Sequence, residues 1–356
     1  VTFTNAAAAE MRSRISAKLS EIISENPNDT NAKRQLSLLP SAKICTIDSF
    51  CINLVRENFF NLNIERDFTI MDDSERQIVE QNVLDTLIGE KYEQGDDEFL
   101  ELVEILSSSK NDKTFATTVS DISNFVTSQA FSDIWLDKAC EIYDPDIPLE
   151  KSICAQYVFE ETKRVCDFAF ELIKSSLSSL SSDDEVYDKL VEIIKSDKEV
   201  FEKIANAVDE KNWDDAMYYV NNTSFVRMTQ KASPYKEIVS KNRNIYKNLL
   251  SKSLAPLYCV DTADYRDDCM LLYPFVSLLT QTVKEFNART LEVKKELNSY
   301  TFSDIEHFAI ELLARFDENG NYCKTELAKE LEKSFDEILI DEYQDTNAAQ
   351  DTLFSM

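Results

Sequence analysis

Glycine and histidine are both scarce in this sequence. Its 356 residues include three glycines, at positions 89, 95 and 320, where average usage is about 7%. This scarcity favours long helices, and no Gly-x-x-x-x-Gly-Lys-Ser/Thr phosphate-binding loop occurs. The one histidine, His307, and eight cysteines without a Cys-x-x-Cys pair exclude the usual zinc patterns. We interpret the cysteines as reduced thiols of a cytoplasmic protein.

Positive charge and long hydrophobic runs are also lacking. There are 38 Lys and Arg against 66 Asp and Glu, which gives a formal net charge of -28. This balance argues against a protein that coats DNA by charge alone, although a local basic groove is compatible with it. The longest apolar stretch, Met270–Leu279, is interrupted by Pro274 and is shorter than the ~20 residues of a membrane span. We expect no membrane partner and no signal peptide.

Near the end of the chain, a short apolar run leads directly into two carboxylates. Ile338–Ile340 has the pattern of a strand buried on both faces, as in a parallel sheet. Asp341 and Glu342 follow at the carboxyl end, where such sheets bind their ligands. There one carboxylate can help to hold Mg²⁺ and the next can deprotonate a water. A buried strand that ends in solvated acids is the alternative.

Two other segments are predicted to pass from a strand into a helix. The first five residues have the pattern of a strand end, and Asn5 is the predicted cap of a helix that runs to about Ile23. Residues 44–47 are predicted to form a second short strand, after which Asp48 or Ser49 is predicted to cap a helix. The length of the chain allows one large domain or two to three smaller ones.

These three segments resemble motifs of superfamily 1 helicases of the UvrD/RecB type. The string Asp-Glu-Tyr-Gln-Asp-Thr at 341–346 is similar to motif II, and VTFTNAAAAEMRSRI at 1–15 is similar to motif Ia. Residues 46–51, Thr-Ile-Asp-Ser-Phe-Cys, look like motif Ib of the AddA branch, which usually has histidine where this chain has Asp48. A carboxylate repels phosphate, so we expect the Asp48 side chain to point elsewhere. AddA proteins are the helicase-nuclease subunits of bacterial recombinational repair.

The resemblance implies a fold and a chemistry. The fold would be an incomplete α/β P-loop NTPase (RecA-like) motor domain with a large all-α insertion, mostly helical overall. The cofactors would be ATP and Mg²⁺. Asp341 would hold Mg²⁺ through water, Glu342 would share the metal and act as base, and Gln344 would link the γ-phosphate to the DNA contacts. The phosphate-binding loop would precede Val1 and a nuclease would follow Met356, so we expect the isolated fragment to be inactive.

The resemblance also implies a path for single-stranded DNA. Phe3 offers a face for base stacking. Thr4 and Asn5 can donate to phosphates beside the free amides of a helix start. Thr46 and Ser49 would bond a further phosphate. The implied partners are single-stranded and double-stranded DNA and, in a heterodimer, a second protein of the AddB type.

Three segments are expected along the chain. Residues 1–60 would be the first part of motor domain 1A, with motifs Ia and Ib. Residues 61–298 would be an all-α insertion similar to the 1B-type insertion of AddA and RecB. Residues 299–356 would return to domain 1A and end just after motif II.

Two capping boxes are predicted at helix starts. Asp72 with Glu75, and Ser303 with Glu306, have the spacing in which a side chain at the cap and one three residues later satisfy each other's backbone amides. His307 lies beside the apolar stripe of the second helix, where a structural role is favoured over a catalytic one.

One part of the insertion is basic. Between Phe225 and Lys252 the only acid is Glu237. The seven basic residues there are Arg227, Lys231, Lys236, Lys241, Arg243, Lys247 and Lys252. Binding depends on the local electrostatic potential and not on the net charge of the chain. We therefore predict that Lys241, Arg243 and Lys247 contact phosphates along a nucleic-acid backbone. The alternatives are a solvated helix face and a surface that docks on an acidic partner protein.

The function that follows is an ATP-dependent DNA helicase of the AddA type, acting in double-strand break repair by homologous recombination and including an exonuclease in the complete protein. A UvrD-type helicase without a nuclease is one alternative. A non-enzymatic module that binds DNA or a partner protein is another. An unrelated α/β hydrolase is the third, and the presence of motifs at both ends of the chain argues against it.

Overall fold

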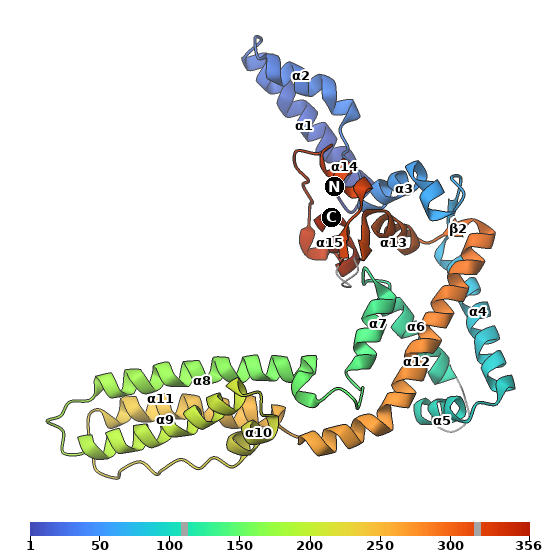
Figure 1. The fold of residues 1–356 in the computed structure, drawn as a ribbon. Coiled ribbons are helices and arrows are strands. Elements are labelled where there is room, and N and C mark those ends of the chain that lie inside the picture. Colours follow the sequence, from blue (N-terminus) through green and yellow to red (C-terminus); the bar gives the residue numbers. More distant parts are fainter. Residues whose placement is uncertain (108–112, 317–321) are drawn as a thin grey trace. The chain divides into compact units, whose positions relative to one another are not determined.

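The computed structural model describes residues 1–107, 113–316 and 322–356. These residues form two compact units. Unit 1 consists of residues 1–137 and 278–356, and unit 2 of residues 138–277. Most of the described chain is helical, and the strands that are present have two or three residues each (Figure 1).

Unit 1 contains both ends of the chain. Its elements before the boundary are α1 (Asn5–Glu25), α2 (Thr30–Leu38), α3 (Ile47–Glu57), β1 (Thr69–Ile70), α4 (Asp73–Gln94), α5 (Asp97–Leu106), α6 (Lys113–Val126) and the start of α7 (Ser132–Glu141). Those after it are the end of α12 (Thr262–Leu297), β2 (Ser299–Tyr300), α13 (Phe302–Leu313), β3 (Ala314–Phe316), β4 (Tyr322–Lys324), α14 (Glu326–Glu332), the 3₁₀ turn η6 (Tyr343–Asp345) and α15 (Ala348–Ser355).

Unit 2 is built from helices. It contains α8 (Ile153–Ser179), α9 (Tyr187–Asp209), α10 (Trp213–Asn221) and α11 (Lys236–Asn248), which continues into a π-helical turn at Leu249–Leu254. Helix α8 packs against α9 and α11, and α10 packs against α9 (Figure 1). Within the described ranges, no helix combines the length and the hydropathy that crossing a bilayer requires.

The core of unit 1 is formed where α3 and α15 pack on α13. Ile47, Val55, Ile305 and Leu353 are all buried there. Full burial of one such side chain contributes roughly 1.5–3 kcal/mol. The helix that follows motif Ib and the helix that follows motif II therefore share one apolar core.

Three segments that lie far apart in the sequence run in parallel beside one another in unit 1. The Thr2 amide donates to the carbonyl of Cys45 (3.0 Å), and the Ile47 amide donates to the carbonyl of Thr2 (3.2 Å). On the other side, the amino group of Val1 donates to the carbonyl of Leu339 (2.6 Å), and the Asp341 amide donates to the carbonyl of Val1 (3.0 Å). Residues 1–2 thus lie between 45–47 and 339–341.

The prediction of a buried strand at Ile338–Ile340 is wrong. The segment has the parallel hydrogen bonds just described but no regular strand, and the side chains of Ile338 and Leu339 are 50% and 75% exposed. Only residue 1 pairs with it among the described residues, so one edge stays open and little covers the two faces. An apolar run shows that a segment can be buried but does not supply the neighbours that would bury it.

The helix caps agree with the sequence in one case and differ in three. The Asp72 carboxylate accepts from the amides of Ser74 (2.8 Å) and Glu75 (2.9 Å), and the Asp72 amide donates to Glu75 (3.4 Å), which confirms the predicted capping box. Helix α1 is capped by Thr4 instead of Asn5, because the Thr4 hydroxyl accepts from the Ala7 amide (3.1 Å).

Helix α3 is capped by Thr46 instead of Asp48 or Ser49, because the paired segment ends at residue 46 and the helix starts directly after it. Helix α13 is likewise capped by Thr301 with Asp304, and the prediction of Ser303 with Glu306 is wrong. Tyr300 pairs with β1 and the extended backbone ends at Thr301, so the cap lies two residues before the predicted one.

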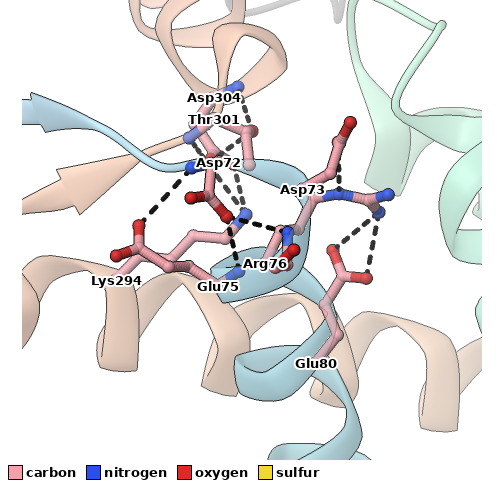
Figure 2. Close-up of polar contacts among 9 residues, drawn as sticks. Asp72, Asp73, Glu75, Arg76, Glu80, Lys294, Thr301 and Asp304 are labelled. Atoms are coloured by element: carbon pink, nitrogen blue, oxygen red, sulfur yellow. Dashed lines mark hydrogen bonds and ion pairs between the residues drawn. The ribbon is translucent and has the colours of Figure 1, made fainter.

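Strands β1 and β2 are a second parallel pair. Thr69 pairs with Ser299 and Ile70 with Tyr300. An ion pair between Lys294 at the end of α12 and Asp304 in α13 (2.8 Å) lies next to them, and Figure 2 shows it beside the first turn of α4. The Lys294 side chain is 7% exposed, so the pair is shielded from solvent.

Candidate functional site

The motif II carboxylates are open to solvent. Asp341, Glu342 and Gln344 are all exposed, and the Asp341 carboxylate accepts from the amide of Glu342 (3.1 Å). Glu342 has a φ of 52°, in the left-handed region, which costs a residue with a side chain about 1–3 kcal/mol. Such strain is concentrated at functional sites. Here the left-handed backbone of Glu342 makes a sharp turn that leads into η6.

The donor set of this segment suits a hard cation. Two carboxylates offer oxygen ligands to Mg²⁺, which keeps several of its waters and is usually held by one or two carboxylates and substrate phosphates. No group of three or more His, Cys, Asp or Glu with metal-binding geometry occurs among the described residues. Asp341 and Glu342 therefore fit Mg²⁺ bound partly through water and together with a nucleotide.

The predicted DNA residues of motif Ia lie at the start of α1. Thr4 and Asn5 are exposed, and the Thr4 hydroxyl is engaged in capping the helix. Phe3 is half-buried and packs against the core of unit 1, which leaves part of its side chain accessible. The first backbone amides of the helix lie beside the two polar side chains, which is an arrangement that favours anions.

Thr46 and Ser49 of motif Ib contact each other at the start of α3. The Thr46 hydroxyl donates to that of Ser49 (2.8 Å) and accepts from the Ser49 amide (3.1 Å). Thr46 is buried and its hydroxyl is engaged by Ser49, so the prediction that Thr46 contacts a phosphate is wrong, whereas Ser49 is half-buried and more accessible. Since Thr2 pairs with Thr46, the structure brings the starts of α1 and α3 to the same side of unit 1 as residues 339–341.

Two acids near the starts of α3 and α15, Asp48 and Glu306, are partly or fully buried, and the motifs gave neither of them a role in the site. Asp48, in the first turn of α3, is half-buried, and burial raises the pKa of its carboxyl. Glu306 on α13 is 5% exposed, and burial raises the pKa of Glu306, to which the charge of Asp48 adds. The side-chain amide of Gln350 donates to Glu306 (2.6 Å) and opposes that rise. The sequence signal for Glu306 is its position beside the apolar stripe of α13, where a carboxylate is unusual.

His307 has the structural role predicted for it. One ring nitrogen lies 2.8 Å from the carbonyl oxygen of Ser303, and the other lies 2.9 Å from that of Gln129. The imidazole therefore connects α13 to the loop before α7, and neither nitrogen is available to a substrate.

The prediction that Arg243 contacts a phosphate is wrong. Its guanidinium is buried and forms a two-bond ion pair with Asp197, with N–O distances of 2.6 and 2.9 Å. It also donates to the carbonyl of Val226, and the hydroxyl of Tyr246 donates to Asp197. Burial alone would lower the pKa of Arg243, but the bonds and charge of Asp197 outweigh it and raise that pKa. Arg243 shares a helix face with the buried Val239 and Tyr246, so it points into the core.

Of the other two predicted residues of the basic stretch, Lys241 is exposed and Lys247 is half-buried. The ammonium of Lys247 lies 4.9 Å from the centre of the Phe225 ring, in cation–π geometry. Arg227 is exposed on the irregular segment that Arg243 holds through Val226. The basic surface that remains is therefore smaller than the sequence suggests, and Arg243 acts as its internal anchor.

The three segments that resemble motifs Ia, Ib and II thus pair with one another, and two exposed carboxylates lie at the end of one of them. The chain matches the UvrD/REP helicase N-terminal domain over residues 1–356, and it belongs to that family.

Among curated proteins, the chain is similar to ATP-dependent helicase/nuclease subunits of several bacteria. It is 32% identical to that of Clostridium beijerinckii, 31% to that of Acetivibrio thermocellus and 30% to that of Bacillus cytotoxicus. In each case the match covers 100% of this chain and 29% of the relative. The family predicted from the motifs is thereby confirmed, and the chain spans less than a third of the length of these relatives.

Proposed function

We propose that this chain is part of an ATP-dependent DNA helicase of the AddA helicase/nuclease type, acting in double-strand break repair by homologous recombination. ATP hydrolysis drives movement along single-stranded DNA. The observation that supports the proposal is the parallel arrangement of residues 339–341, 1–2 and 45–47, in which the motif II segment pairs with the motif Ia segment and that one pairs in turn with the motif Ib segment. A change at one segment then reaches the next through direct backbone hydrogen bonds.

The proposed fold is a RecA-like P-loop domain formed by residues 1–60 and 299–356, with an all-α insertion at 61–298. The parallel pairing of the short segments supports the first part of this proposal. Every regular element between residues 73 and 297 in the described ranges is helical, which supports the second. The compact units divide at 137/138 and 277/278, so the proposed insertion contributes helices to both of them.

The proposed roles in motif II follow from the exposed oxygen donors. Asp341 would hold Mg²⁺ through water, and Glu342 would share the metal and act as general base toward the attacking water. Mg²⁺ would supply charge neutralisation for the nucleotide phosphates when bound. Gln344, two residues after Glu342, relates the state of the γ-phosphate to the neighbouring DNA segments.

The proposed DNA contacts lie at the starts of α1 and α3. Thr4, Asn5 and Ser49 donate to phosphates together with backbone amides, Thr46 orients Ser49, and Phe3 stacks on a base. In unit 2, Lys241 and Lys247 are proposed to meet further phosphates of single-stranded or double-stranded DNA. A second protein of the AddB type, a nuclease elsewhere in the complete gene product and a place in the cytoplasm belong to the same proposal. All eight cysteines are free thiols, which supports the last of these.

ATP turnover by the complete gene product tests the proposal. Glu342→Gln is expected to leave nucleotide binding intact and to lower DNA-stimulated turnover by about 10²–10⁴, the usual contribution of a general base. Glu337→Gln, an exposed acid in the same segment, is the matched control and is expected to behave as the wild type. Normal turnover in the Glu342 variant would contradict the assigned role, and DNA binding without any ATP turnover in the wild type would favour the non-enzymatic module instead.

A further inference from the structure

A buried acid lies between the helix that follows motif Ib and the helix that follows motif II. Glu306 is 5% exposed and belongs to α13, which packs against both α3 and α15 in the apolar core of unit 1. Placing a carboxylate in such a core is costly unless it is hydrogen-bonded. Its partners therefore show what this acid holds in place.

A short hydrogen bond links Glu306 to the start of α15. The side-chain amide of Gln350 donates to Glu306 at 2.6 Å. Gln350 is also half of the capping box of α15, since its backbone amide donates to the Asn347 side chain (2.8 Å) and its own side-chain oxygen accepts from the Asn347 amide (3.4 Å). Both ends of the Gln350 amide are thus engaged, and Glu306 fixes the orientation of the group that starts the helix. Asn347 follows motif II directly, because that motif ends at Thr346.

Helix α13, which carries Glu306, also packs against α3, and the two helices share the buried core of unit 1. Burial is the main cause that raises the pKa of Glu306, and the negative charge of Asp48 in the first turn of α3 adds to the rise. Two residues before Asp48, the Thr46 hydroxyl caps the same helix and contacts Ser49. A displacement of α15 changes the hydrogen bond of the buried carboxylate, and a displacement of α3 changes the packing of the helix that carries it.

We propose that Glu306 is a positioning residue that couples the DNA contact at the start of α3 to the motif II segment through Gln350 and α15. The inference rests on the proposed helicase function and extends it to a residue outside the motifs. A buried charge is weak evidence for stability, because an apolar replacement of similar volume is often neutral or stabilising. A role in coupling can therefore be distinguished from a role in stability by measuring both properties in the same variants.

The experiment compares Glu306→Met, Glu306→Gln and Gln350→Ala in the complete gene product. Unfolding temperature, basal ATP turnover, and turnover across a titration with oligo(dT) are measured for each. Glu306→Met is expected to keep the wild-type unfolding temperature and basal turnover while its DNA stimulation falls about tenfold or more, within the usual range of coupling between sites. Gln350→Ala is expected to lose the same DNA stimulation at unchanged basal turnover, with a lower unfolding temperature, because it removes part of the capping box of α15 and the donor to Glu306. Glu306→Gln is expected to restore most of the stimulation, because its amide oxygen accepts the same bond from Gln350. Glu311→Met, an exposed acid on the same helix, is the matched control.

Full DNA stimulation in both Glu306→Met and Gln350→Ala would overturn the inference. A parallel fall of unfolding temperature, basal turnover and stimulated turnover would also overturn it, since that result describes a residue that only supports the fold. Wild-type protein without DNA-stimulated turnover would overturn the proposed function itself, and the coupling with it.

Discussion

Removing the buried guanidinium of Arg243 is expected to destabilise unit 2 strongly. The side chains of Arg243 and Asp197 are 4% and 1% exposed, and Arg243→Ala deletes two bonds to the carboxylate and one to the carbonyl of Val226. Asp197 is then left charged in an apolar core with the hydroxyl of Tyr246 as its remaining partner. Breaking a buried pair from one side costs about 3–5 kcal/mol. At about 2–4 °C for each kcal/mol in a domain of this size, the unfolding temperature should fall by roughly 6–20 °C.

Tryptophan fluorescence during urea unfolding can measure this effect in unit 2 alone. The chain has two tryptophans, and Trp213 is buried in the core of unit 2, so a Trp135→Phe background reports that core. Lys241→Ala, an exposed change two residues away, should stay within about 0.5 kcal/mol of the parent. Arg243→Met combined with Asp197→Leu should recover most of the loss, because no unpaired charge remains. If Arg243→Ala lowers the free energy of unfolding by less than about 1 kcal/mol, the buried pair is refuted and Arg243 is an exposed residue, as the sequence suggested.

Three further predictions concern DNA binding, local stability and pH. Charge reversal at Lys241 and Lys247 should weaken binding to single-stranded DNA regardless of its sequence and reduce the salt slope by roughly 1.4, at about 0.7 for each phosphate contact, so an unchanged slope in a salt titration would remove these contacts. Hydrogen exchange should be fast at 338–341, where the apolar side chains are open, and slow within α8 and α9, whereas uniform protection would show that the open edge is covered in solution. Because burial raises the pKa of Glu306, the folded state holds its proton more tightly than the unfolded state. Stability should therefore fall as pH rises from the ordinary carboxyl range through that raised pKa, and Glu306→Gln should flatten this slope in unfolding curves; equal slopes would argue against the raised pKa.

Local sequence patterns predicted the features that are decided within a few residues. The Asp72–Glu75 capping box was predicted correctly because both partners lie in one turn. At α13 two capping patterns overlap, Thr301 with Asp304 and Ser303 with Glu306, and local rules do not choose between them. The choice is made by the pairing of Tyr300 with Ile70, which depends on residues some distance away in the chain.

The candidate site was predicted in the same uneven way. Motif strings located the three segments that we propose to bind nucleotide and DNA, and these segments pair with one another in the structure. A charge count could not reveal that Arg243 points inward, because its partner Asp197 is 46 residues earlier on another helix. Nor could the apolar run at Ile338–Ile340 show that it lacks neighbours, since cover comes from tertiary contacts. Glu306 was missed because its role depends on Gln350, which is 44 residues later.

The pairing of residues 1–2 with 339–341 has a consequence for the order of events during synthesis. The amino group of Val1 and the carbonyl of Leu339 are separated by 338 residues. At about 5–20 residues per second, the first segment waits roughly 20–70 s before its second neighbour leaves the ribosome. Unit 2, whose helices α8, α9, α10 and α11 follow one another closely along the chain, can complete its core during that interval. A nascent chain that stops before residue 339 would therefore carry a finished helical unit, while residues 1–2 would lack the neighbour at 339–341 and stay open on that side to unwanted strand pairing.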